Sequence, residues 1–208
     1  MLAAIAAAGG LVLAAGGAWW ARRGSWRRPE DTRRMRAGSV WLVVPVATVT
    51  AGAIGASAPA VWVPAGVLYA VGGVVAGWID LDVHRLPNKV LAVTGAGAGI
   101  AAVLAAAVGG RWDALAWSAG GAVGLGLVYV VMVVLGSTGL GDVKLAFVSG
   151  MVLGLQGWQV VVRGAAAGIL VAGLVAAGLL ITRRATRSDH LAFGPAIVAG
   201  AVVALCVG

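Results

Sequence analysis

The residues best suited to chemistry in this chain are two acids that stand beside long apolar runs. Asp142 lies in the segment 139–144, which reads Gly-Leu-Gly-Asp-Val-Lys, and Asp80 directly follows the apolar run 67–79. An ionisable side chain at membrane depth costs about 2.5–3.5 kcal/mol on insertion scales, so it is a candidate for function. Two such acids are the minimum for an aspartyl protease. One carboxyl is ionised and activates a water, and the other is protonated and hydrogen-bonds the scissile carbonyl.

The surroundings of Asp142 leave a second interpretation open. An Asp at the start of a helix stabilises free backbone N–H groups, so Asp142 taken alone is equally typical of a helix cap. Gly139 and Gly141 lack a Cβ, which allows unusual backbone angles and close approach of another helix or of a peptide.

The polar stretch that begins at Asp80 is expected to leave the helix at once. The residues assigned to a short loop are Asp82, His84 and Arg85. Pro87 prevents a helix from running through, and Asn88 is predicted to cap the next helix.

The elements that carry these acids are predicted to be membrane helices. The chain has 208 residues, of which 61% are hydrophobic, and one span needs about 20 apolar residues. This predicts an all-α, polytopic membrane protein of about eight transmembrane helices, forming a single membrane-embedded domain over 1–208. The predicted spans are 1–21, 38–57, 60–79, 90–109, 114–136, 143–156, 160–182 and 191–207, the sixth being short. Gly120 and Gly124 fit the small-xxx-small pattern of helix contacts.

The basic residues predict how the chain is oriented. Cytoplasmic loops carry an excess of Lys and Arg, and the region 22–37 is expected to be a basic cytoplasmic loop. Its basic residues are Arg22, Arg23, Arg27, Arg28, Arg33, Arg34 and Arg36. Threading eight helices then places a second group on the same side: Arg85, Lys89, Lys144, Arg183, Arg184 and Arg187. Only Arg111 and Arg163 are predicted on the outer side of the membrane. Asp80 and Asp142 are both predicted on the cytoplasmic side.

Composition argues against several other classes. The net charge of +8 is concentrated at predicted helix ends, where it sets orientation and attracts anionic lipid, so no nucleic-acid partner is predicted. Tryptophans near the span ends are typical of an aromatic belt; they are Trp19, Trp20, Trp41, Trp62, Trp78, Trp112 and Trp158. Cys206 is the one cysteine and His84 and His190 lie on separate loops, so no metal and no cofactor is predicted.

Three motifs together resemble the type IV prepilin peptidases, the bacterial branch of the GxGD intramembrane aspartyl proteases. Segment 80–88 reads D-x-D-x-H-R-L-P-N, segment 139–144 reads G-x-G-D-x-K, and 192–195 reads Ala-Phe-Gly-Pro. The family has an Asp six residues before its Leu-Pro-Asn-like turn, so Asp80 matches and Asp82 does not. The resemblance therefore implies Asp80 and Asp142 as catalytic residues. Flanking residues are assigned to substrate binding: Pro87, Asn88, Gly139, Gly141 and Lys144.

The resemblance also implies a substrate and a location. Family members remove a basic leader peptide from prepilin or pseudopilin precursors at the cytoplasmic face of the bacterial inner membrane. Long members also carry a cytoplasmic domain with two Cys-x-x-Cys pairs and N-methylate the new N-terminus. Here the corresponding region 22–38 has no cysteine, so peptidase activity alone is expected. The partners expected are the prepilin substrate and membrane lipid.

Two other classes are consistent with paired membrane acids. A catalytically inactive homologue or scaffold would carry a similar sequence, and paired acids also serve as proton relays in transporters. Transport is disfavoured because both acids are predicted at helix ends on one face, away from the bilayer midplane.

Overall fold

The computed structural model describes residues 1–31, 35–136, 138–183 and 192–208. Within these ranges the chain forms α-helices and two short 3-10 helices and has no strand, which confirms the all-α prediction. The elements are α1 (Leu2–Arg23), η1 (Ala37–Leu42), α2 (Val43–Ser57), η2 (Ala60–Trp62), α3 (Val63–Val83), α4 (Asn88–Gly109), α5 (Trp112–Val134), α6 (Leu140–Gly154), α7 (Trp158–Ile181) and α8 (Gly194–Val207). Five residues named above lie outside the described ranges: Arg33, Arg34, Arg184, Arg187 and His190.

The number of long spans is smaller than the number of helices. Six helical segments in the described chain are long and apolar enough to cross a membrane. They are α1, η1 with α2 (38–57), η2 with α3 (60–83), α4, α5 and α7. By contrast α6 has 15 residues and α8 has 14, both shorter than the roughly 20 residues that one crossing needs. The molecule is a multi-pass membrane protein whose described residues form eight α-helices, as predicted. The short sixth helix was expected, whereas the shortness of α8 was not.

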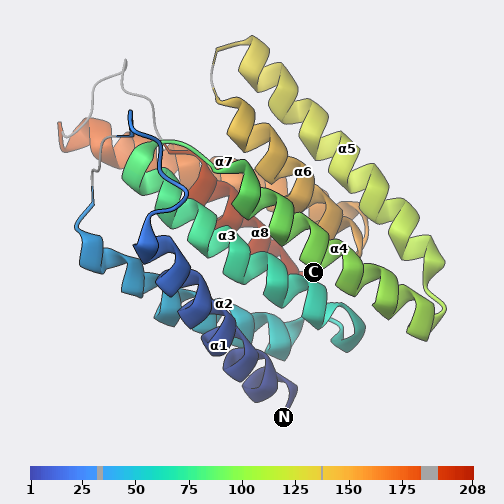
Figure 1. The fold of residues 1–208 in the computed structure, drawn as a ribbon. Coiled ribbons are helices and arrows are strands. Elements are labelled where there is room, and N and C mark those ends of the chain that lie inside the picture. Colours follow the sequence, from blue (N-terminus) through green and yellow to red (C-terminus); the bar gives the residue numbers. More distant parts are fainter. Residues whose placement is uncertain (32–34, 137, 184–191) are drawn as a thin grey trace.

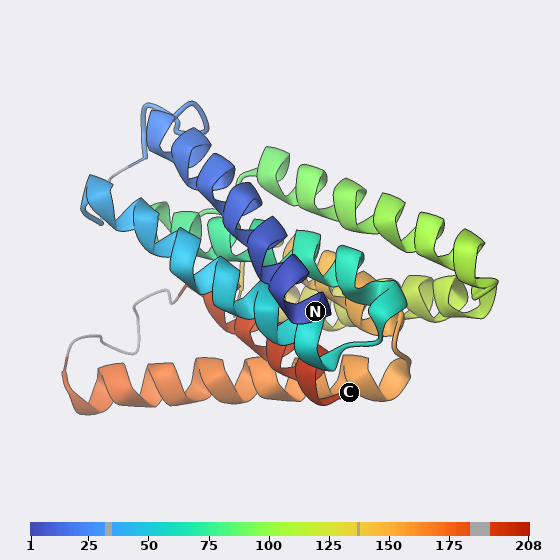
Figure 2. The ribbon, with the colours of Figure 1, turned by 90° about the horizontal axis from the view of Figure 1, so that it is seen from below.

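Helix α3 is the centre of the bundle. It packs against α1, α2, α4, α6 and α8. Of its apolar segment 67% is buried, against 11–33% for the other five long spans. The chain runs back and forth, so that α1, α3, α5 and α7 end where α2, α4, α6 and α8 begin (Figure 1). Both chain termini lie at the opposite end of the bundle (Figures 1 and 2).

The boundaries of α3 correct the predicted loop around Asp82. The helix continues to Val83, and Asp82 is helical with 0% of its surface exposed. It ends at His84, which adopts a left-handed backbone (φ 50°) and donates its N–H to the Asp80 carbonyl. The predicted Asn88 cap is also wrong, because Pro87 is the N-cap residue and no side chain caps this helix.

Glycines allow α5 and α6 to pack with their backbones in contact. A Cβ on Gly150 would overlap the carbonyl oxygen of Gly121, and a Cβ on Gly154 would overlap that of Trp117. Gly120 and Gly124, which the small-xxx-small pattern selected, would have no atom within 4 Å of an added Cβ. The interface therefore uses the neighbouring face of α5.

The tryptophan belt is incomplete. Trp62 and Trp78 are buried, with 4% and 7% of their surface exposed. Trp78 packs edge-on against Trp26, with ring centroids 6.4 Å apart, and donates Nε1–H to Ser39 Oγ at 3.2 Å. Trp62 in η2 and Trp78 in α3 are thus buried within the protein and do not form part of an exposed tryptophan belt.

Candidate active site

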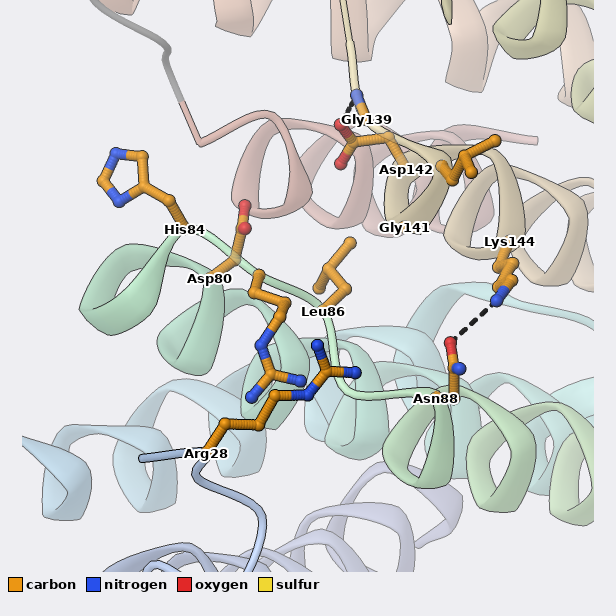
Figure 3. Close-up of a pocket in the computed structure, with 11 residues that line it drawn as sticks. Arg28, Asp80, His84, Leu86, Asn88, Gly139, Gly141, Asp142 and Lys144 are labelled. Atoms are coloured by element: carbon orange, nitrogen blue, oxygen red, sulfur yellow. Dashed lines mark hydrogen bonds between the residues drawn. The ribbon is translucent and has the colours of Figure 1, made fainter. Parts of the chain in front are cut away.

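A polar cavity of about 450 Å³ opens at the end of the bundle where α3 ends and α6 begins. Asp80 and Asp142 both line it, and Figure 3 shows their side chains entering from two different helices. The other lining residues are Arg28, His84, Arg85, Leu86, Asn88, Gly139, Leu140, Gly141 and Lys144. The fold thus brings together the two segments that the sequence analysis selected, although about 60 residues separate their acids in the chain.

Asp80 is held by the start of α8. It lies in the last turn of α3 with 5% of its surface exposed. The backbone N–H of Gly194, the first residue of α8, donates a 3.0 Å hydrogen bond to its Oδ2. The third motif, at 192–195, therefore contributes a donor to the first acid.

Asp142 both caps its helix and faces the cavity. It is the third residue of α6, and its Oδ2 accepts a 3.1 Å hydrogen bond from the Gly139 N–H. Its own N–H bonds back to the Gly139 carbonyl at 3.0 Å. The side chain is 8% exposed. Helix capping and a place in the cavity are thus compatible, because one carboxylate oxygen suffices for the cap.

Two contacts join the segment after α3 to the start of α6. A Cβ on Gly141 would lie only 3.0 Å from the Leu86 Cβ, so the absence of a side chain lets Leu86 sit directly on the α6 backbone. Lys144 Nζ donates a 2.8 Å hydrogen bond to Asn88 Oδ1 (Figure 3). Of the flanking residues assigned to substrate binding, Pro87 alone does not line the cavity; it is buried and is the N-cap residue of α4.

A buried hydrogen bond ties α3 to α6 below the cavity. Ser149 donates to the Leu145 carbonyl at 2.8 Å, so Tyr69 donates its O–H to Ser149 Oγ, 2.7 Å away. Tyr69 and Ser149 are both fully buried. The sequence analysis did not select this pair. It could have been found because Tyr69 and Ser149 are polar side chains within otherwise apolar helices.

The basic loop after α1 lies against the end of α3, which the sequence analysis did not foresee. Arg27 pairs with the buried Asp82 carboxylate, which also accepts the Met35 N–H at 2.9 Å. Arg85 pairs with Asp31, and this hydrogen-bonded guanidinium holds the pKa of Asp31 below its usual range. The sequence feature that could have predicted this contact is the presence of two acids, Glu30 and Asp31, within the arginine-rich run.

These ion pairs set the charge of the cavity. Among the residues that the structure describes, three cationic side chains line the cavity: Arg28 from the loop, Arg85 and Lys144. Figure 3 shows Arg28 and Lys144 at different parts of its wall. The cavity therefore holds three cations and the two acids, and two of the cations have further acidic partners. Asp31 pairs with Arg85, and Glu30 lies 3.8 Å from Arg28.

Comparison with known proteins gives the family. No curated protein and no solved structure matches the chain. A family model, described as the type IV leader peptidase family, matches residues 67–205. This match covers most of the chain and includes both acids and the 192–195 motif, as the sequence resemblance predicted. With the multi-pass helical fold, it establishes that the chain belongs to the type IV leader peptidase family, a family of membrane peptidases.

Proposed function

We propose that this protein is an aspartyl endopeptidase that uses Asp80 and Asp142 to remove the basic leader from a prepilin or pseudopilin. The observation that carries the proposal is that both acids, from α3 and α6, line one cavity at the same end of the bundle. Each has a backbone N–H donor on one oxygen and so has its other oxygen available for water or substrate.

In the proposed reaction, the Asp142 carboxylate takes a proton from a water, whose oxygen attacks the scissile carbonyl carbon. Protonated Asp80 gives its proton to the carbonyl oxygen, which yields a tetrahedral gem-diol. Asp142 then delivers its proton to the amide nitrogen as the C–N bond breaks, and Asp80 recovers a proton from the diol as the new carboxyl forms. No covalent enzyme intermediate is needed.

The helix positions favour this division of roles. Asp142 stands at the N-terminal end of α6, where a carboxylate is stabilised. Asp80 stands near the C-terminal end of α3, where a carboxylate is disfavoured. The Gly194 N–H acts in the opposite direction, since it stabilises a charged Asp80, but it binds Oδ2 and leaves Oδ1 to carry the proton.

The proposed location is the cytoplasmic face of the bacterial inner membrane. Basic residues gather at the end of the bundle that holds the cavity, and Arg111 and Arg163 lie toward the other end. The positive-inside rule then places the cavity at the cytoplasmic face. In this arrangement the whole chain acts as one membrane-embedded peptidase domain, and 22–37 is its cytoplasmic loop.

The test is cleavage of a model precursor by the purified protein in lipid nanodiscs. The precursor has a short basic leader that ends in Gly, followed by an apolar helix of about 20 residues. We expect leader loss on a gel, a single cut site by mass spectrometry, and no product with either Asp→Asn variant. An intact precursor with wild-type protein would instead favour the inactive-homologue alternative. Radiolabelled S-adenosylmethionine in the same reaction is expected to leave the product unlabelled.

A further inference from the structure

An apolar groove runs from the cavity toward the membrane interior, between α4 and α6. Its volume is about 530 Å³. The lining residues are Asn88, Leu91, Ala92, Val143, Lys144, Phe147 and Val148. Asn88 and Lys144 line both the groove and the polar cavity. The groove therefore adjoins the cavity at the Lys144–Asn88 hydrogen bond (Figure 3).

We propose that this α4–α6 groove binds the apolar segment of the substrate that directly follows the scissile bond. The inference rests on the proposed function and adds a recognition site to it. A peptide whose scissile bond lies between Asp80 and Asp142 leaves the cavity over Asn88 and Lys144. The segment that enters the groove must be apolar, because beyond these two residues the lining side chains are all apolar.

The charge of the cavity gives a second reason for a recognition site of this kind. The described lining holds three cations, Arg28, Arg85 and Lys144, against the two catalytic acids, so it offers a basic leader no excess of negative charge. Affinity for the precursor must then come from the part of the substrate that is not basic. A groove that adjoins the cavity provides that binding by burying apolar side chains.

The length of the groove limits what it holds. At its outer end is the Lys144–Asn88 bond, and at its inner end α4 and α6 converge, where a Cβ on Gly95 would lie 3.1 Å from Val148 Cγ2. Four helical residues, as from Asn88 to Ala92 or from Lys144 to Val148, rise about 6 Å. The groove therefore fits about one to two turns of a helix, the first residues after the cut.

Two other apolar grooves provide matched controls. One lies between α2, α3 and α8 and is lined by Ala199, and one lies between α5, α7 and α8 and is lined by Ala172. Neither shares a lining residue with the polar cavity. Ala92→Phe, Ala172→Phe and Ala199→Phe thus place the same added volume in three different grooves.

The first experiment measures cleavage kinetics on two substrates. With the full precursor, Ala92→Phe is expected to raise KM by about tenfold or more, while Ala172→Phe and Ala199→Phe stay near wild type. With a short peptide that ends two residues after the cut, all four proteins should be equal. Equal KM values on the full precursor, or an equal loss on both substrates, would overturn the inference.

The second experiment requires neither cleavage activity nor correct folding of the Ala92→Phe variant. Phe147 is replaced by benzoylphenylalanine in the Asp142→Asn background, and Leu174 on α7 is the lipid-exposed control; they are 46% and 73% exposed. We expect photocrosslinking to the precursor from position 147 alone, at residues within about two helical turns after the cut site. If position 147 crosslinks to lipid alone, the α4–α6 groove does not bind the precursor. If it crosslinks to the precursor but the wild-type protein does not cleave it, the groove binds the precursor and the proposed peptidase activity is wrong.

Discussion

Gly194 holds the carboxyl group of Asp80 across 114 residues of chain, through a 3.0 Å hydrogen bond from its backbone N–H to Oδ2. A Cβ at position 194 would lie 2.8 Å from the same oxygen, closer than side chains tolerate. Glycine is therefore what allows the start of α8 to come this near to α3. The last motif of the sequence thus positions the first acid.

The first prediction concerns this contact. Gly194→Ala should displace the Asp80 carboxyl and lower kcat by about 100-fold, the size of effect expected for misplacing a catalytic group by about 1 Å. Gly173→Ala on α7 is the control, because no atom lies within 4 Å of its added Cβ. Wild-type turnover by Gly194→Ala would show that the contact does not position Asp80.

The second prediction separates three acids. Asp80→Asn and Asp142→Asn should each lower kcat by at least about 10²–10⁴-fold, the usual contribution of general acid–base catalysis. Asp82→Asn should retain much of the activity, because Asp82 does not line the cavity. It should instead lower stability by about 1–3 kcal/mol, since it leaves Arg27 without its carboxylate. Thermal melts and cleavage assays of the three variants test this, and loss of activity in Asp82→Asn alone would reverse the assignment.

The third prediction compares the two glycines that precede Asp142. Gly141→Val should block cleavage, because its Cβ would meet Leu86 at 3.0 Å and its branches would push the two segments apart. Gly139→Ala should stay active, since the nearest atom to its Cβ is 3.8 Å away and its N–H remains available to Asp142. Cleavage assays on protein of equal membrane yield measure the difference. Normal turnover by Gly141→Val would reduce Gly141 to a packing residue.

The fourth prediction is a bell-shaped pH profile. Activity requires one protonated and one ionised carboxyl, so it falls at low pH when Asp142 gains a proton and at high pH when Asp80 loses one. Infrared spectra near the optimum should show a protonated-carboxyl band that disappears in Asp80→Asn and remains in Asp142→Asn. The opposite pattern would exchange the two roles.

The fifth prediction concerns the docking of the basic loop. The hydrogen-bonded Arg85 lowers the pKa of Asp31 in the folded protein below the ordinary value of 3.8. The contact therefore stabilises the docked loop above the unfolded pKa, and this stabilisation is lost as pH falls through the folded pKa. Hydrogen exchange at residues 24–31 should accelerate as pH is lowered from about 6 to about 3, after correction for the intrinsic pH dependence.

Arg85→Gln is the matched variant for this experiment. It removes the charged partner of Asp31, so exchange in the loop should already be fast at the higher pH and should show little further change on acidification. If wild type and Arg85→Gln exchange alike at every pH, the Asp31–Arg85 pair does not hold the loop.

Much of the fold was accessible from the sequence. Apolar runs separated by charged or Gly/Pro-containing segments predicted the helices to within a few residues, because a bilayer admits little other than helices for such a composition. The spacing of Asp80 from Leu86 and the 139–144 segment also selected two acids that share one cavity. Alternation of helices through a membrane was enough to place both acids at the same end.

Tertiary structure decided the contacts that no local pattern encodes. The sequence could not show that Asp82 is buried beneath Arg27, that Gly194 reaches Asp80, or that Gly121 rather than Gly120 meets α6. Each depends on the rotation and depth of one helix against another, and apolar residues on every face of a helix leave that rotation unspecified. Backbone packing fixes this rotation. A glycine allows two helices to approach closely at one rotation, whereas at another rotation the side chain of a neighbouring residue would clash.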